Sequence, residues 1–556
     1  MGLVIFETSI DALETIVEEG ARASKQTTKR FIEPAQGTLR RATSRRHHII
    51  FGRRGSGKSS LLYKSATDLD ETKQAIAYVD LEPFKGHQYP DVLISVLLAV
   101  LTKYRAWLTI EDTSEKSWLK KVLSLIHLQW ATKDDSKRNL LELIEINTRE
   151  LSTHLHLADD SRLVGKFSDT KGKRDEVSIG GKASVKSQLL ESSLESNIAS
   201  AVESSASAEI QEESRRSKKD YLHRKIIDFR QIFQNFTELT GGDCFLFLDD
   251  LYHIHRTDQA YLLDYFHRIA KGSNLWIKVG TIKNRSTWYI HSPQPIGLKL
   301  GDDADEINLD LTLEKFSVSK DFLKAILETY INESQAPSLN DFVADGGMER
   351  LVMASGGVTR DFLGIFRRSI DETRERLTRN RNHPRGPKIG AEDVNVASGG
   401  YGETKKEEFQ RDTLEDRQEL EEAFNKLRMF CLDKSKTNIF LVDQDLKGSD
   451  NELLQELIDL RLIHHVKSRV TVSSRPGKVF RALLLDVSQY TGERKRRDVD
   501  MIEFWKEANK EAIRKASLIY DPSQSTDQLE KEVVSKKSAM VDEKAKPVDP
   551  KQQKLI

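Results

Sequence analysis

The residues Gly52–Ser59, with the sequence GRRGSGKS, constrain the fold of this chain more than any other segment. They follow the apolar run His48–Phe51 and precede Ser60–Tyr63, which is typical of a helix start. This is the pattern G-x-x-x-x-G-K-[ST] in a strand–loop–helix context. Glycines let the backbone wrap closely, so that successive amides point at an anion, and the helix N-terminus adds partial positive charge. The sequence therefore predicts an α/β fold with a phosphate-binding loop.

Within this loop, two side chains have the chemistry that a nucleotide triphosphate needs. Lys58 is expected to reach the β- and γ-phosphates, and the hydroxyl of Ser59 is expected to hold Mg²⁺. The predicted cofactors are ATP and Mg²⁺. The candidate nucleotide-binding residues are Gly52, Arg53, Arg54, Gly55, Ser56, Gly57, Lys58, Ser59 and Ser60.

A second apolar run, Cys244–Leu248, ends in two carboxylates, Asp249 and Asp250. A central parallel strand is buried on both faces and is therefore continuously apolar, and its carboxyl end delivers acidic side chains to the ligand crevice. Asp249 is predicted to bind Mg²⁺, directly or through water, while Asp250 would orient or deprotonate the attacking water. Asp250 is shorter than the glutamate common at this place, which predicts slow hydrolysis.

A further strand is predicted at Leu275–Thr281, and polar side chains follow it. Thr281, Asn284 and Arg285 fall where a γ-phosphate could be sensed, and the sequence does not choose among them. Arg285 could instead serve a neighbouring subunit as an arginine finger.

Two glycines, Gly356 and Gly357, are predicted to end one helix, and Arg360 then lies in the first turn of the next. A cation there opposes the helix dipole, which favours a functional role over a structural one. Arg360 is therefore a candidate sensor of the γ-phosphate.

The order of these motifs resembles that of an AAA+ ATPase, most closely the origin-recognition/initiator-loader group and its bacterial relatives. The resemblance covers residues 45–100 and 221–490, and Ile389–Ala397 resembles the helix that ends the lid of that group. It implies a parallel-sheet core, a helical lid with Arg360 as the sensor-2 arginine, and an α+β winged-helix domain. An Asp-Asp pair also occurs in signalling (STAND/NACHT-like) ATPases, so that group stays open.

The predicted organisation divides the chain into six parts. These are a helical lead-in (1–45), the nucleotide-binding core (46–103 and 221–315), a partly flexible insertion (104–220), a helical lid (316–400), a winged-helix domain (414–491) and a disordered charged tail (522–556). The insertion is interpreted either as a solvated spacer or as a regulatory, partner-binding arm.

The 87 basic and 87 acidic residues balance, so any contact with double-stranded DNA must be local. The winged helix offers Arg469, Arg475, Lys478 and Arg481. A second basic stretch consists of Arg374, Arg376, Arg379, Arg381 and Arg385. For the first set, the alternative is a winged helix that contacts protein. For the second, a solvated face is favoured, and contact with a DNA backbone is the alternative.

The two cysteines, Cys244 and Cys431, lie far apart in apolar runs, which indicates buried thiols in a reducing compartment. The longest apolar run is too short to span a membrane, and we expect a cytoplasmic protein. The predicted function is a slow, DNA-associated ATPase switch that forms a homo-oligomer or engages a partner protein. The alternatives are a signalling or antiviral-defence ATPase that controls an effector protein, and a scaffold that does not hydrolyse ATP.

Overall fold

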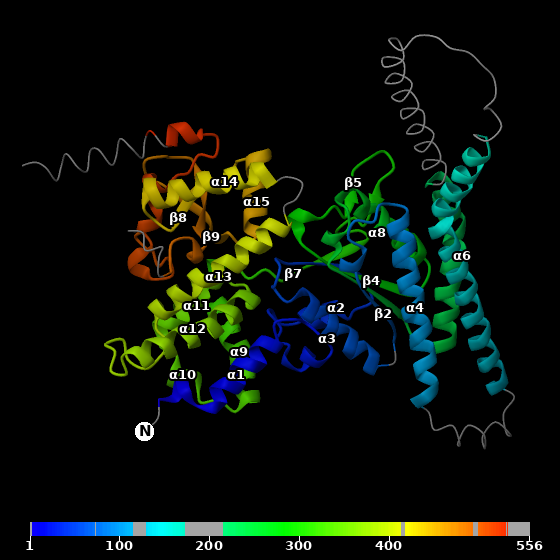
Figure 1. The fold of residues 1–556 in the computed structure, drawn as a ribbon, viewed down its shortest axis with the longest axis horizontal. Coiled ribbons are helices and arrows are strands. Elements are labelled where there is room, and N and C mark those ends of the chain that lie inside the picture. Colours follow the sequence, from blue (N-terminus) through cyan, green and yellow to red (C-terminus); the bar gives the residue numbers. More distant parts are fainter. Residues whose placement is uncertain are drawn as a thin grey trace, which may run out of the picture.

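The computed structural model describes residues 3–72, 74–114, 129–172, 215–412, 417–492, 499–529 and 531 (Figure 1). Helices and a parallel sheet form one side of the molecule, and a helical lid with a winged-helix domain forms the other. The structure is thus an α/β core with a parallel sheet and a phosphate-binding loop, followed by a helical lid and a winged helix, as predicted.

Five parallel strands form the central sheet in the order β2-β3-β4-β1-β7. They are β1 (His47–Phe51), β2 (Ala75–Asp80), β3 (Cys244–Asp249), β4 (Leu275–Thr281) and β7 (Ala304–Asn308). The small hairpin of β5 (Tyr289–Ile290) and β6 (Ile296–Gly297) lies between β4 and β7 in sequence.

Strand β3 explains why the sequence shows an unbroken apolar run. All six of its residues are buried. Leu246 and Leu248 pack on one face of the sheet with α4 (Asp91–Ser114) and α8 (Arg256–Ala270), whereas Phe245 and Phe247 pack on the other. That second face is covered by α3 (Lys58–Glu71) and α2 (Thr38–Ala42). Successive side chains of a strand point to opposite faces, so a strand covered on both faces is apolar throughout.

The described parts of the predicted insertion are helical and lie along α4 (Figure 1). Helix α6 (Gln129–Gly172) and the helix over residues 215–240 join the core cluster through Leu140, Ile144, Leu151 and Phe229. Residues 115–128 and 173–214 lie outside the described residues. The stretch Asp91–Thr109 of α4 is long and apolar enough to cross a membrane, but 56% of it is buried against the rest of the protein.

The lid is a bundle of helices. Its helices are α9 (Phe316–Ser334), α10 (Leu339–Phe342), α11 (Asp345–Ser355), α12 (Thr359–Arg379) and α13 (Ala391–Asp412). The N-terminal helix α1 (Thr8–Glu19) packs against α9 and α12, so the predicted lead-in contributes to the lid.

The winged-helix domain has a three-stranded antiparallel sheet in the order β8-β10-β9. Its elements are α14 (Arg417–Met429), β8 (Ile439–Asp443), α15 (Ser449–Asp459), β9 (Ile463–Thr471) and β10 (Val479–Leu485). Strand β8 was not predicted. The chain then returns over this domain between residues 499 and 529, burying Ile513, Tyr520 and Leu529. It therefore stays packed beyond the predicted start of the tail, and residues 532–556 lie outside the described residues.

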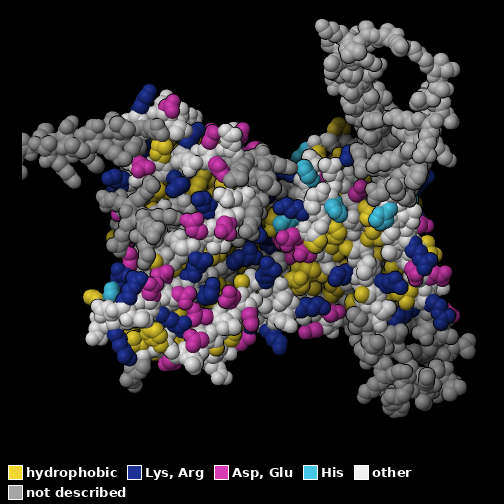
Figure 2. Space-filling model, viewed as in Figure 1, with side chains coloured by type: hydrophobic (Ala, Val, Ile, Leu, Met, Phe, Trp, Pro, Cys, Tyr) yellow, Lys and Arg dark blue, Asp and Glu magenta, His cyan; other side chains and the backbone are white. Residues whose placement is uncertain are grey.

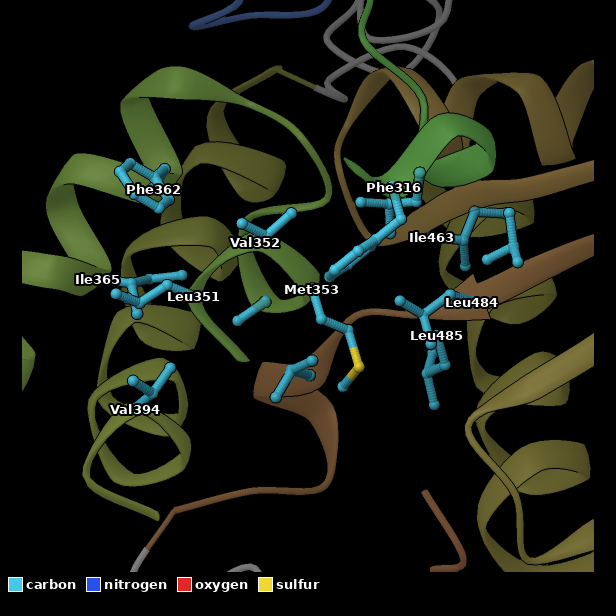
Figure 3. Close-up of a cluster of buried hydrophobic side chains, with 14 of the residues drawn as sticks. Phe316, Leu351, Val352, Met353, Phe362, Ile365, Val394, Ile463, Leu484 and Leu485 are labelled. Carbon is cyan, nitrogen blue, oxygen red and sulfur yellow. The ribbon is translucent and has the colours of Figure 1, made fainter. Parts of the chain in front are cut away.

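The lid and the winged helix share one hydrophobic core (Figure 3). Met353 of the lid lies near Leu484 and Leu485 of β10, and Phe316 lies near Ile463 of β9. Phe316 also stacks on Trp505 of the returning segment, with ring centroids 4.2 Å apart. Burial of these side chains joins the two domains into a single packed unit.

Candidate nucleotide-binding site

The predicted phosphate-binding loop connects the end of β1 to the start of α3. Gly55 and Gly57 have φ values of 83° and 97°, which are accessible to glycine at little cost. A Cβ on Gly55 would lie 2.6 Å from Cβ of Arg360. Glycine at this position therefore lets the loop turn and lets the lid approach its backbone.

Lys58 is buried at the start of α3 and its ammonium is held by the loop itself. Its Nζ donates to the carbonyl oxygens of Gly52, at 3.0 Å, and of Arg53, at 3.2 Å. The ring of Tyr252 lies 5.8 Å from the same nitrogen. Burial lowers the pKa of Lys58. The ammonium is thus positioned inside the loop, where a phosphate oxygen could replace a carbonyl partner.

Asp249 meets Ser59 at the carboxyl edge of the sheet. The Ser59 hydroxyl donates a hydrogen bond to the carboxylate, and Tyr78 on β2 donates to its Oδ2 at 2.5 Å. The backbone N–H of Asp250 donates to Oδ1 at 3.0 Å. Burial, and then the neighbouring charge of Asp250, raise the pKa of Asp249 to about 7. The structure therefore brings together the two residues that were predicted to bind the metal.

The loop and this carboxylate fit a nucleotide with its metal. A hydroxyl and a carboxylate oxygen are the hard ligands that Mg²⁺ prefers. In addition, Oγ of Ser56 is buried and has no hydrogen-bond partner among the residues that the structure describes. An unpaired buried hydroxyl is costly, and a phosphate oxygen would satisfy it.

Asp250 follows β3 in a left-handed conformation, with φ 56° and ψ 49°. Aspartate tolerates this region better than most residues because of its short polar side chain. The carboxylate is partly exposed, and its charge acts on Lys58 and His253. Its location at the crevice is compatible with the predicted contact to water, which remains a prediction.

The three candidates after β4 diverge in the structure. Thr281 is buried, its hydroxyl pairs with Ser286, and its carbonyl accepts from the N–H of Gly52 at 3.3 Å. Asn284 instead hydrogen-bonds Asp459 of the winged helix. Arg285 ends the short 3-10 turn Lys283–Arg285. Thr281 bonds the phosphate-binding loop directly, and which of the three senses phosphate stays a prediction.

Arg360 lies in the first turn of α12, as expected, and directly over the loop. Its backbone N–H donates to the carbonyl of Gly55 at 3.2 Å. Its charge adds to the burial that lowers the pKa of Lys58. The adjacent Asp361 does not pair with it, since that carboxylate is bound by Lys405 of the lid and by Arg461 of the winged helix.

Two roles near the site were not predicted from sequence. The guanidinium of Arg53 hydrogen-bonds the lid and the residues that follow β7, and it contacts the winged helix. Arg53 was expected to bind nucleotide, and in the structure it also links domains. Tyr78 fixes the metal-binding carboxylate and stacks on Tyr63, with ring centroids 4.2 Å apart. The position of Tyr78 near the end of β2, next to β3, was the only sequence signal for it.

The predicted basic surfaces are smaller in the structure than the sequence indicated. Arg469 and Arg475 are exposed on the wing, and Lys478 pairs with Asp443 at 3.0 Å. Arg481 is half-buried and bonds Asn451 of α15. Over the described part of the face in Figure 2, basic and acidic side chains are interspersed.

The second basic stretch is also largely used inside the protein. Arg374 pairs with Asp11 and Glu14 of α1, at 2.7 and 2.6 Å. Arg376 forms a two-armed ion pair with the buried Asp393. These contacts join α1 to α12 and hold α12 against α13, so both arginines have partners within the lid, where a solvated face was expected.

Comparison with known proteins gives matches to solved structures only. No family model matches the chain, and no curated protein matches it by sequence. The Walker-type ATPase PABY2304 of Pyrococcus abyssi is 12% identical and aligns over 81% of this chain and 93% of its own, with a TM-score of 0.36. Orc1 of Aeropyrum pernix, solved in complex with DNA, is 12% identical over 81% and 88%, with a TM-score of 0.32. Cdc6p of Pyrobaculum aerophilum is 10% identical over 78% and 84%, with a TM-score of 0.29.

The resemblance to known ATPases rests on the arrangement of the chain's own elements. A parallel sheet of order β2-β3-β4-β1-β7 carries the phosphate-binding loop after β1 and two carboxylates after β3. A helical lid places Arg360 over that loop, and a winged helix follows. The chain resembles a phosphate-binding-loop ATPase with a helical lid.

Proposed function

We propose that this protein is an ATP-binding switch that hydrolyses ATP slowly and associates with DNA. The observation that carries the proposal is the convergence of Lys58, Ser59 and Asp249 near the first turn of the lid helix α12, which holds Arg360. In phosphoryl transfer, positioning and charge stabilisation supply nearly all of the catalysis, and these side chains have that chemistry.

Each residue has a role in this proposal. Backbone amides of the loop and Lys58 hold the phosphates, while Ser59 and Asp249 hold Mg²⁺, which would neutralise phosphate charge when bound. Asp250 accepts a proton from, or orients, the attacking water. Its side chain is one methylene shorter than glutamate, and its backbone is held left-handed. Both features support slow turnover rather than a fast motor.

The wing supports the association with DNA. The hairpin over residues 471–479 and the returning segment enclose an open groove of about 800 Å³, to which Arg475, Lys478, Arg514 and Lys515 contribute. Lysine and arginine side chains bind backbone phosphates without reading sequence. Binding is therefore expected to be salt-dependent and weakly sequence-selective.

A comparison of the full chain with Lys58→Ala tests the proposal. The measurements are binding of a fluorescent ATP analogue, phosphate release, and binding to a DNA duplex with and without ATP. We expect the variant to lose nucleotide binding and the ATP response of DNA binding. Equal phosphate release by both proteins would exclude the ATPase assignment. DNA binding that ignores ATP in both would exclude the switch, and the signalling alternative would then be tested by ATP-dependent assembly.

A further inference from the structure

Arg53 is a buried cation in the phosphate-binding loop that contacts three other parts of the protein. Its side chain is 4% exposed. The guanidinium donates to Asp310 at 3.2 Å, to the carbonyl of Leu311 at 2.8 Å and to the carbonyl of Gly356 at 3.0 Å. Its Nη1 lies 3.4 Å from Nδ1 of His464 on β9. The same residue therefore belongs to the nucleotide site and contacts the lid and the winged helix.

The contact with His464 continues into a buried polar network. Nε2 of His464 lies 2.8 Å from Oδ2 of Asp486, which also accepts from Lys405 at 2.6 Å. Lys405 pairs in turn with Asp361 of α12 at 3.0 Å. A neutral imidazole with its proton on Nε2 satisfies both neighbours, because Nδ1 then accepts from Arg53. Burial lowers the pKa of His464, which favours that neutral form.

A second contact docks the winged helix on the same edge of the core. Asp459 of α15 hydrogen-bonds Asn284, in the segment that follows β4. The docked winged helix thus contacts the residues after β4, where the γ-phosphate would be sensed.

The docked arrangement leaves little room between the lid and β9. A Cβ on Gly356 would lie 2.0 Å from Nδ1 of His464. The lid and winged helix also share a core (Figure 3), so they are expected to move as one unit. Close-packed interfaces of this kind shift between discrete arrangements rather than deforming gradually.

We infer that Arg53 is a positioning residue that couples nucleotide binding to docking of the winged helix. The inference rests on the proposed ATP-binding function and adds the route by which the site controls the winged helix. In the present arrangement the carbonyl of Arg53 accepts from Lys58. A nucleotide that draws Lys58 to its phosphates changes the backbone of Arg53 and loosens its contact with His464. Coupling of this kind is reciprocal, so undocking also favours nucleotide.

Crosslinking measures the docking directly. Asn284→Cys and Asp459→Cys place two thiols at the contact between the segment after β4 and α15 of the winged helix, and both native cysteines are buried. A short bismaleimide is added to the full-length chain with or without ATP and Mg²⁺. We expect ATP to lower the crosslinked fraction by about fivefold, within the range of ordinary allosteric coupling. An unchanged fraction at saturating nucleotide would overturn the inference.

Variants of Arg53 and of His464 test whether the contact between them causes the response of crosslinking to ATP. Arg53→Met and, in a separate protein, His464→Gln should each lower crosslinking without nucleotide and remove most of its response to ATP. His464→Gln leaves the loop sequence intact and should bind the ATP analogue about fivefold more tightly. Arg40→Met, an exposed arginine on α2, is the matched control and should behave like the parent. A full ATP response in both variants would refute the role of Arg53.

The two proposals fail in different ways. If the parent chain binds no ATP analogue, the proposed function is wrong. If it binds the analogue with unchanged crosslinking, the ATP site stands and the coupling through Arg53 is wrong.

Discussion

Lys405 offers a quantitative test of the buried network between the lid and the winged helix. Its ammonium lies 2.6 Å from Asp486 and 3.0 Å from Asp361, and all three side chains are at most 1% exposed. Asp361 keeps a second cation, Arg461, whereas Asp486 is otherwise bound by the neutral His464 and by Ser488. Lys405→Met keeps the length of the side chain and leaves Asp486 without a cation. Breaking a buried pair from one side costs about 3–5 kcal/mol.

The pH dependence separates this effect from lost packing. Burial alone would raise the pKa of Asp486, but Lys405 and hydrogen bonding by His464 hold that pKa below its ordinary value. A lowered carboxyl pKa contributes stability above the unfolded pKa of about 4, and that stability is lost as the pH falls through the folded value. In Lys405→Met, burial is no longer opposed by the lysine charge, so the variant loses stability as the pH rises from 4 to 7.

Urea denaturation followed by tryptophan fluorescence measures the difference, because Trp505 lies at the interface between the lid and the winged helix. We expect a loss of about 3 kcal/mol at pH 7 and roughly 1 kcal/mol at pH 4, where a protonated Asp486 costs only a hydrogen bond. Lys406→Met, an exposed neighbour on α13, is the control and should change stability by less than about 0.5 kcal/mol. A loss that is equal at both pH values would refute the electrostatic explanation.

Three further predictions concern the site. Tyr78→Phe removes the hydrogen bond to Asp249 and should raise the Mg²⁺ concentration for half-maximal nucleotide binding about tenfold; an unchanged Mg²⁺ titration would contradict this role. Gly280→Ala places a Cβ 2.7 Å from Oδ1 of Asp249 and 2.8 Å from Leu62, so thermal denaturation should show a loss of about 1–3 kcal/mol, and a neutral result would mean that the crevice can expand. Asp250→Asn should keep ATP-analogue affinity and lower phosphate release by about a hundredfold or more, whereas normal release would remove Asp250 from the reaction.

The features that the sequence predicted well depend on short-range patterns. The strand Leu275–Thr281 was predicted with its observed bounds because an apolar run is closed on both sides by polar residues. The loop between β1 and α3 has a fixed spacing of glycines and a lysine, so its conformation follows from a few consecutive residues. The glycines before α12 likewise have positive φ values of 59° and 80° and end the preceding helix.

What the sequence could not predict depends on pairs that are distant in the chain. Arg53 and His464 are 411 residues apart, and no local pattern distinguishes a tethering arginine from one that faces phosphate. Arg374 was interpreted as a surface charge because its partners Asp11 and Glu14 belong to a helix at the other end of the chain. The same holds for the returning segment, whose apolar residues are too widely spaced for a periodic signal.

The buried polar network between the lid and the winged helix restricts their relative orientation, which the shared apolar core does not. Burial of apolar area is non-directional, so the side chains around Met353 would pack in more than one orientation of the two domains. Ion pairs such as Lys405–Asp486 hold only at short range and in one geometry. A buried charge that loses its partner is costly, so orientations that separate these groups are disfavoured. The apolar core therefore holds the lid and winged helix together, and the polar network selects the orientation in which β9 reaches Arg53.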